Sequence, residues 1–165
     1  MTYPEPGYLG DTGEVSATHR PSDHEPELTY ANGNTAHYLA TGDSTDGLFG
    51  LYRWVMGPEP SGPGPHFHRT IAESFYVLTG GVRIYDGTHW IDTTPGDFVH
   101  VPMGGIHGFR NESGAPASML IHFAPGAPRE DYFEGLAAFA VSGPPGDDEL
   151  ATFYLEHDNI WVDER

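Results

Sequence analysis

Four residues whose side chains bind metals stand at spacings that could bring them to one ion. His66 and His68 alternate, Glu73 follows after a gap of four residues, and His107 lies in a separate segment rich in glycine. On a strand, both imidazoles of the pair point to the same face, because strand side chains repeat every two residues. Imidazole together with carboxylate suits Zn, Fe, Mn, Ni, Co or Cu, and the ligand types do not choose among these metals. The spacing therefore predicts a site for one divalent transition metal per subunit.

The rest of the composition narrows how such a site is built. The chain contains no cysteine, so any metal must be held by histidine and carboxylate. A histidine pair alone is weak evidence, because two surface histidines give the same pattern. If all four residues do bind, one or two positions stay open on an octahedral ion, and a substrate or dioxygen would bind there.

Short strands separated by turns must position these side chains. The 165 residues include Gly 22 and Pro 15, a content that favours many turns over long helices. Many short strands at close, even spacing predict an all-β sandwich or barrel. Strands are expected at 35–40, 48–56, 66–67, 73–79, 82–86, 88–93, 97–101, 105–111 and 117–123.

The two ends of the chain differ from this strand-rich region. Residues 1–34 are polar and rich in Pro, Gly and acidic residues, so we expect an irregular N-terminal arm. Apolar residues at helical spacing over 129–141 and 147–157 predict one or two C-terminal helices. The expected organisation is an arm at 1–34, a β-barrel at 35–127 and a helical extension at 128–165.

The segments around the four predicted ligands resemble the two signatures of the cupin superfamily. The pattern H-x-H-x4-E-x6-G at 66–80 resembles the first signature, although the glycine that opens it is displaced into the loop 57–64. The pattern G-x5-P-x-G-x2-H-x3-N at 96–111 fills every fixed position of the second. The resemblance implies a cupin-type double-stranded β-helix, or jelly-roll barrel, with His66, His68, Glu73 and His107 as the metal ligands.

A finer resemblance is to single-domain cupins of the cupin_2 type that are quercetin 2,3-dioxygenase-like. It is carried by GPGPHFH at 62–68, ESFYVLTG at 73–80, PGDFVHVP at 95–102 and HGFRN at 107–111. This resemblance implies a metal-dependent dioxygenase, an oxidoreductase that acts on a flavonol-like or other small aromatic or polyphenolic substrate. It also implies that Glu73 doubles as a catalytic general base on the substrate hydroxyl.

Two other functions stay open at this point. The chain could be a non-oxidative, metal-dependent cyclase or isomerase of polyketide-like metabolites, in which the ion acts only as a Lewis acid. It could also be a non-catalytic cupin that binds a small molecule. Activity without oxygen would separate the first alternative from a dioxygenase.

Five aromatic or apolar residues are candidates for the substrate pocket. Tyr52 and Trp54 share one strand face and could stack on an aromatic substrate, while Phe75, Phe109 and Met119 could form the cavity wall. Packing in the barrel core accounts for all five equally well.

Charge and terminal sequence bear on partners and location. The formal net charge is −17 and all 7 basic residues are arginine, which disfavours nucleic acid and anionic membranes as partners. We see neither a signal peptide nor an apolar stretch of membrane-spanning length, so a cytoplasmic protein is expected. Cupins commonly pair through barrel edges, and the arm could exchange between subunits, so we also expect a homodimer.

Overall fold

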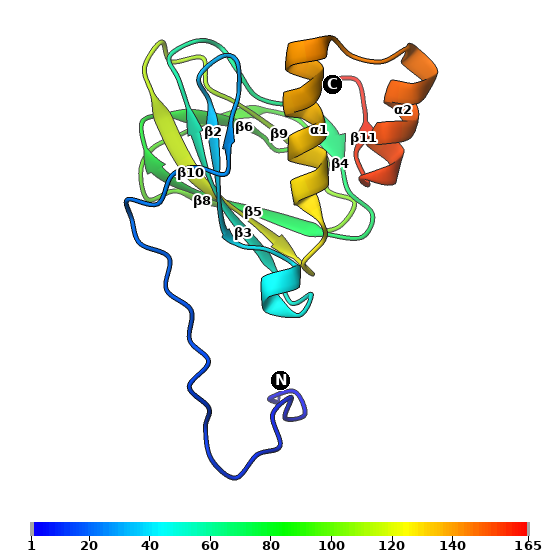
Figure 1. The fold of residues 1–165 in the computed structure, drawn as a ribbon. Helices are drawn as coiled ribbons and strands as arrows, with labels where there is room; N and C mark the ends of the chain where they lie inside the picture. Colours follow the sequence, from blue (N-terminus) through cyan, green and yellow to red (C-terminus); the bar gives the residue numbers. More distant parts are fainter. Residues whose placement is uncertain (1, 165) are drawn as a thin grey trace.

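The computed structural model describes residues 2–164 and folds most of them into an antiparallel β-barrel with two helices beside it (Figure 1). The strands are β1 (Leu28–Thr29), β2 (Thr35–Ala40), β3 (Gly50–Met56), β4 (His66–Phe67), β5 (Ala72–Thr79), β6 (Val82–Tyr85), β7 (Trp90–Thr93), β8 (Phe98–Val101), β9 (Gly108–Arg110), β10 (Ala117–Ala124) and β11 (Ile160–Trp161). The helices are α1 (Arg129–Ser142), α2 (Asp147–Glu156) and a short 3-10 turn, η1 (Asp43–Thr45). The predicted all-β fold with C-terminal helices is confirmed.

Three sheets make up the β-structure. Six strands form the largest, in the order β1-β2-β3-β10-β5-β8, and three form a second, in the order β7-β6-β9. The third pairs β11 with β4. Because β10 lies between β3 and β5, the last long strand joins segments that are far apart in the chain, with Ile121 opposite both Tyr52 and Phe75.

The barrel core follows from the alternation of side chains along the central strands. In β5, Glu73, Phe75 and Val77 are buried, at 4%, 0% and 1% exposure, while Tyr76 between them is exposed. Burial of each apolar side chain contributes about 1.5–3 kcal/mol. The same alternation that packs Phe75 and Val77 therefore directs the carboxylate of Glu73 into the barrel.

The two helices pack on the barrel through aromatic rings. Phe133 of α1 lies 5.2 Å from the ring of Tyr52 and 5.3 Å from that of Trp54. Phe153 of α2 in turn stacks on Tyr132 of α1 with 5.6 Å between ring centroids. Helix α1 is thus part of the barrel core, and α2 is attached mainly through α1.

Both ends of the chain differ in detail from the predicted organisation. At the N-terminal end, β1 lies within the predicted arm but pairs with β2, so the sheet begins before residue 34. At the C-terminal end, the predicted helical extension also contains β11, which pairs with β4 inside the barrel region. Among residues 2–164, no helix has the length and apolar character that a membrane crossing needs.

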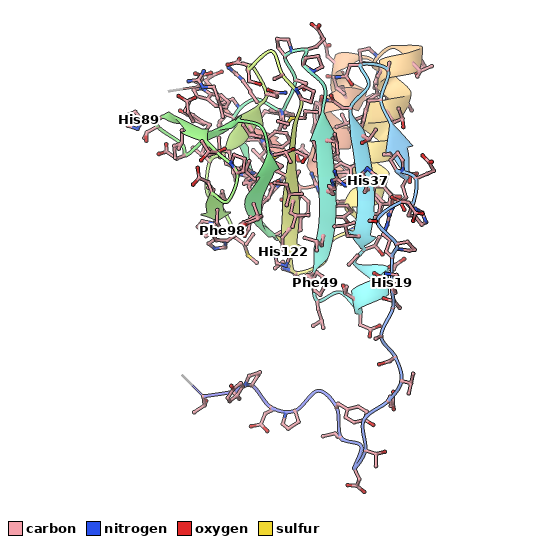
Figure 2. The ribbon with its side chains drawn as sticks, turned by 90° about the vertical axis from the view of Figure 1, so that its left-hand side faces the viewer. His19, His37, Phe49, His89, Phe98 and His122 are labelled. Carbon is pink, nitrogen blue, oxygen red and sulfur yellow. The ribbon has the colours of Figure 1, made fainter. Side chains whose placement is uncertain are left out.

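The N-terminal arm extends away from the barrel in both views (Figures 1 and 2). Its apolar side chains Tyr3, Leu9 and Val15 are fully or almost fully exposed. Figure 2 also labels His19 in the arm and His89 on the barrel, and both side chains are exposed to solvent. These surface histidines are not part of the predicted ligand set.

Candidate metal centre

The structure brings the four predicted ligands together. One ligating atom from each of His66, His68, Glu73 and His107 lies within 4.8 Å of the others. All four residues are buried, with 1–4% of their surface exposed. A buried group of this composition could hold one metal ion.

Backbone hydrogen bonds explain how His107 reaches the other ligands from a distant segment. The N–H of His107 donates to the carbonyl oxygen of His66 at 2.8 Å, and the N–H of His66 donates back to His107 at the same distance. In the turn before His107, Gly104 has φ +79° and donates its N–H to the carbonyl of His68 at 2.7 Å. Only glycine adopts this conformation without steric cost, so the turn is fixed beside the first pair of ligands.

Each imidazole is held by a hydrogen bond from its outer nitrogen to a backbone carbonyl. The Nδ1 atoms of His66 and His107 lie 2.9 Å from the carbonyl oxygens of Gly64 and Gly105, respectively. A carbonyl can only accept, so Nδ1 carries the hydrogen in both rings. In a neutral ring this leaves the lone pair on Nε2, and such outer contacts are how proteins orient histidine ligands.

His68 is oriented in the same way, but by a carbonyl from the other end of the chain. Its Nδ1 lies 2.6 Å from the carbonyl oxygen of Asp158. All three histidines therefore have Nε2 as the nitrogen that remains for a metal ion.

Glu73 places one oxygen against two of these nitrogens. Its Oε2 lies 3.1 Å from Nε2 of His68 and 2.7 Å from Nε2 of His107. A neutral imidazole with its hydrogen on Nδ1 would put a lone pair against the carboxylate at this distance, and two acceptors repel. The arrangement is favourable only when a proton or a cation lies between them. The donor set therefore fits a divalent transition metal.

The pKa values show how the cluster is charged without a metal. Burial would raise the pKa of Glu73, but His107 and His68 outweigh it and hold that pKa well below its usual range. Burial also opposes a charge on His107, yet the carboxylate of Glu73 raises the pKa of that imidazole. Burial, together with the nearby His107, lowers the pKa of His66 to about 3. The ring of His107 therefore holds a proton beside Glu73 more readily than a free imidazole does.

Asp158 is a functional candidate that the sequence analysis missed. It follows α2, has φ 54°, and its carbonyl accepts the hydrogen bond from His68. Its carboxylate accepts from the backbone N–H of Arg69 at 2.9 Å and from both the N–H and the hydroxyl of Thr70, at 2.8 and 2.7 Å. Burial raises the pKa of Asp158, but these hydrogen bonds lower it further than burial raises it. One residue thus fixes both the ring of His68 and the turn that follows it.

Strand β11 brings the C-terminal segment alongside the first two ligands. Trp161 pairs with His66 and Ile160 with Phe67, and the ring of Trp161 lies 5.2 Å from that of His66. A two-residue strand followed by acidic residues carries little periodicity, so the sequence pattern does not predict β11. The only available signal was the apolar triplet at 160–162 after the helix.

A cavity of about 260 Å³ opens onto the centre and is lined by both His66 and Glu73. Of the five predicted pocket residues, Trp54 and Phe109 line this cavity. The other three do not line it and are fully buried in the barrel core. They are Tyr52, Phe75 and Met119. The substrate role of Trp54 and Phe109 stays a prediction.

A family model described as "Cupin domain" matches residues 52–123, which include all four predicted ligands. This match spans a little under half of the chain. Quercetin 2,3-dioxygenase of Bacillus subtilis (strain 168) is 33% identical over 75 residues, a segment that covers 46% of this chain and 22% of that enzyme. The chain thus matches about a fifth of the length of this curated relative.

Several solved structures have a similar fold. A predicted oxalate decarboxylase from Thermotoga maritima matches with a TM-score of 0.57 and 20% identity, over 66% of this chain and 99% of that chain. The polyketide cyclase RemF from Streptomyces resistomycificus matches with a TM-score of 0.54 and 23% identity, over 68% and 80%. At these identities the likeness supports the barrel fold alone.

Proposed function

We propose that this protein is a metal-dependent enzyme that holds one divalent transition metal through His66, His68, Glu73 and His107. The observation that carries the proposal is the inward orientation of three buried Nε2 atoms around a buried carboxylate oxygen. That geometry is unfavourable for neutral rings alone and is the one that a cation stabilises. Ni, Mn, Fe, Co, Cu and Zn are all compatible with these donors.

The reaction that we propose is oxygenation of a small aromatic or polyphenolic substrate, of which a flavonol is the first candidate. Support comes from the segment shared with quercetin 2,3-dioxygenase and from the aromatic wall of the cavity, which includes Trp54, Phe109 and Trp161. Ring faces of this kind bind aromatic substrates by stacking and edge contacts. When bound, the metal would supply Lewis acidity and the site at which dioxygen is activated.

Glu73 is the residue that we propose as general base. Both imidazole contacts involve its Oε2, and the residue lines the cavity, so Oε1 is the oxygen that can meet a substrate hydroxyl. Its carboxylate is held in the ionised form, which a base requires. Replacement by Gln keeps the shape and an oxygen donor but removes the basic group. We expect Glu73→Gln to lose turnover while still binding metal; unchanged turnover would refute the base role.

The function is tested by metal analysis of the purified protein, followed by oxygen uptake with a panel of flavonols. The proposal predicts about one equivalent of a divalent metal and oxygen consumption that depends on it. His66→Ala serves as the variant that lacks a ligand, and His89→Ala as the matched surface control. Turnover that persists without oxygen would contradict a dioxygenase and support a cyclase or isomerase. Tight ligand binding without turnover under either condition would support a binding protein.

We also propose a homodimer. The outer face of the six-stranded sheet carries a shallow groove lined by apolar residues that include Tyr76, Phe98 and Leu120. Exposed apolar faces of this kind often mark contacts between subunits. Sedimentation velocity should show a dimer, and a monomer at all concentrations would refute this proposal.

A further inference from the structure

Arg129, the first residue of α1, is a buried arginine without a carboxylate partner. It is 4% exposed, and none of the ion pairs between residues 2–164 includes it. Its two terminal nitrogens donate to neutral acceptors, the carbonyl of His157 at 2.7 Å and Oδ1 of Asn159 at 3.1 Å. Its Nε has no hydrogen-bond partner among the described residues. Buried arginines are rare unless they are paired, so this charge calls for an anion.

The guanidinium packs against aromatic rings, which attract the cation without neutralising it. Its carbon lies 4.3 Å from the ring centroid of Tyr132 and 5.1 Å from that of Phe123. The backbone carbonyl of His157 and the side-chain Oδ1 of Asn159 accept its hydrogen bonds and hold the group in place. Arg129 is therefore rigidly positioned before any ligand arrives.

Arg129 lines the same cavity as two of the predicted metal ligands, His66 and Glu73. Among the described residues that line the cavity, it is the only basic one. A divalent ion and Arg129 together would bring three positive charges to this enclosed space, and Glu73 would supply one negative charge. The imidazoles are neutral when they bind metal. Two positive charges would remain, in a protein whose overall formal charge is −17.

We propose that the cavity binds a small organic anion, with an anionic oxygen near Arg129 and the metal and with an aromatic or apolar body against the remaining wall. This inference rests on the proposed metal site and names its substrate class. The aromatic and apolar part of the cavity wall includes Phe133, Leu136 and Tyr154. The cavity volume, about 260 Å³, lies just below the roughly 300–1,000 Å³ of pockets for drug-sized ligands. An aromatic substrate that carries a carboxylate, phenolate or enolate fits this site.

The anion preference is tested on the whole protein loaded with Zn²⁺, which is redox-inert, in the absence of oxygen. Isothermal titration compares benzoate with benzamide, its neutral isostere. A second arm compares pentafluorophenolate with pentafluorobenzene and so separates a phenolate-type oxygen from a carboxylate. Charged hydrogen bonds predict that the preferred anion binds about 10- to 100-fold more tightly than its neutral counterpart. Equal affinities in both arms would overturn the proposal.

Two variants connect the preference to Arg129. Arg129→Gln should reduce the anion preference about tenfold or more, whereas Arg83→Gln, an exposed arginine already paired with Asp92 and Glu112, should leave it unchanged. If Arg129→Gln does not fold, the Nε–H signal of Arg129 in the ¹⁵N NMR spectrum of the wild-type protein gives a second test. This signal should shift on addition of the bound anion. Anion binding without such a shift, or a preference that Arg129→Gln retains, would refute the role of Arg129.

These outcomes are separate from those of the proposed oxygenase activity. Anion binding to the Zn²⁺ form without any oxygen uptake by other metal forms would reject the dioxygenase and keep this inference. Oxygen uptake on neutral substrates, together with equal affinity for benzoate and benzamide, would support the dioxygenase and reject this inference.

Discussion

The two ends of the chain lie outside the matched segment 52–123, yet they relate to the four-residue cluster in opposite ways. The N-terminal arm before Arg20 extends away from the barrel, with side chains such as Leu9 exposed. The C-terminal segment 157–162 returns to the barrel, pairs with β4 and supplies the carbonyl that orients His68. A segment far along the chain from the ligand motifs can therefore still lie next to the site in space.

The C-terminal segment contributes mainly through its backbone. A backbone carbonyl has no residue-specific signature, and its placement depends on the turn that ends α2. Here Asp158 supplies the left-handed turn, with φ 54°, and its side chain fixes the loop after His68. Residues 2–19 make no such contact with the centre, and their apolar side chains Tyr3, Leu9 and Val15 are exposed. The comparison can be tested by altering one end at a time.

The largest effect is expected from removal of the C-terminal segment. A chain that ends after Glu156 loses the partner of His68 Nδ1, the strand beside β4 and both acceptors of Arg129. Loss of such outer contacts costs about 10- to 100-fold in metal affinity, and we expect at least the upper value here. Zinc titration against a chelator measures it. Wild-type zinc affinity in a folded truncated chain would show that the C-terminal segment does not support the centre.

Substitutions of Asp158 should have the next largest effect and separate its two roles. Asp158→Gly keeps the left-handed conformation but removes the carboxylate, and Asp158→Ala loses both. Asp158→Asn keeps the conformation and part of the hydrogen bonding. We expect metal affinity to fall about tenfold in the Ala variant, with smaller losses for Gly and least for Asn. Asp163→Ala, at an exposed position nearby, is the matched control, and an equal loss in that variant would argue against a specific role.

Acidification should weaken metal binding because the proton on His107 competes with the metal. Glu73 raises the pKa of His107, so the ring must release a proton before it binds. Affinity should fall about tenfold per pH unit below the pKa of His107. Zinc titration across a pH series measures this slope, and a flat profile would show that the four-residue cluster is not the binding site.

The metal-free protein should also lose stability in acid through His66. Burial lowers the pKa of this ring to about 3 in the folded state, from an ordinary value of 6.5. Because the folded pKa is lowered, the stabilising effect is complete above pH 6.5 and is lost as the pH falls toward 3. Urea unfolding across this window should show the decline, and His66→Phe should make it shallower. An identical decline in that variant would contradict the assignment.

The smallest effect on the centre is expected from deletion of the arm. A chain that begins at Arg20 should bind zinc with wild-type affinity, because no contact of the four ligands involves residues 2–19. Sedimentation velocity on the same variant tests whether the arm joins subunits, in which case the dimer becomes weaker. A loss of metal affinity would show that the two ends do not differ as the structure indicates.

Local patterns in the sequence were sufficient for the barrel and for the four residues that cluster inside it. The turn glycines and alternating side chains place the strands, and the spacing of His66, His68 and Glu73 follows from strand geometry. The residues that could not be predicted depend on contacts between distant segments. Arg129 and Asp158 read as ordinary helix and turn residues until the fold brings them to the cavity. The sequence also does not distinguish cavity wall from core. Tyr52 and Phe75 are pocket candidates by sequence, yet both are buried in the core.

We propose that three histidines bind one metal through Nε2 while Nδ1 stays protonated. The most direct measurement is ¹⁵N NMR of the histidine rings during titration with zinc. The structure predicts that the Nε2 resonances of His66, His68 and His107 move together at one equivalent, with hydrogen retained on Nδ1 in each ring. Binding through Nδ1, or a response from fewer than these three rings, would contradict it.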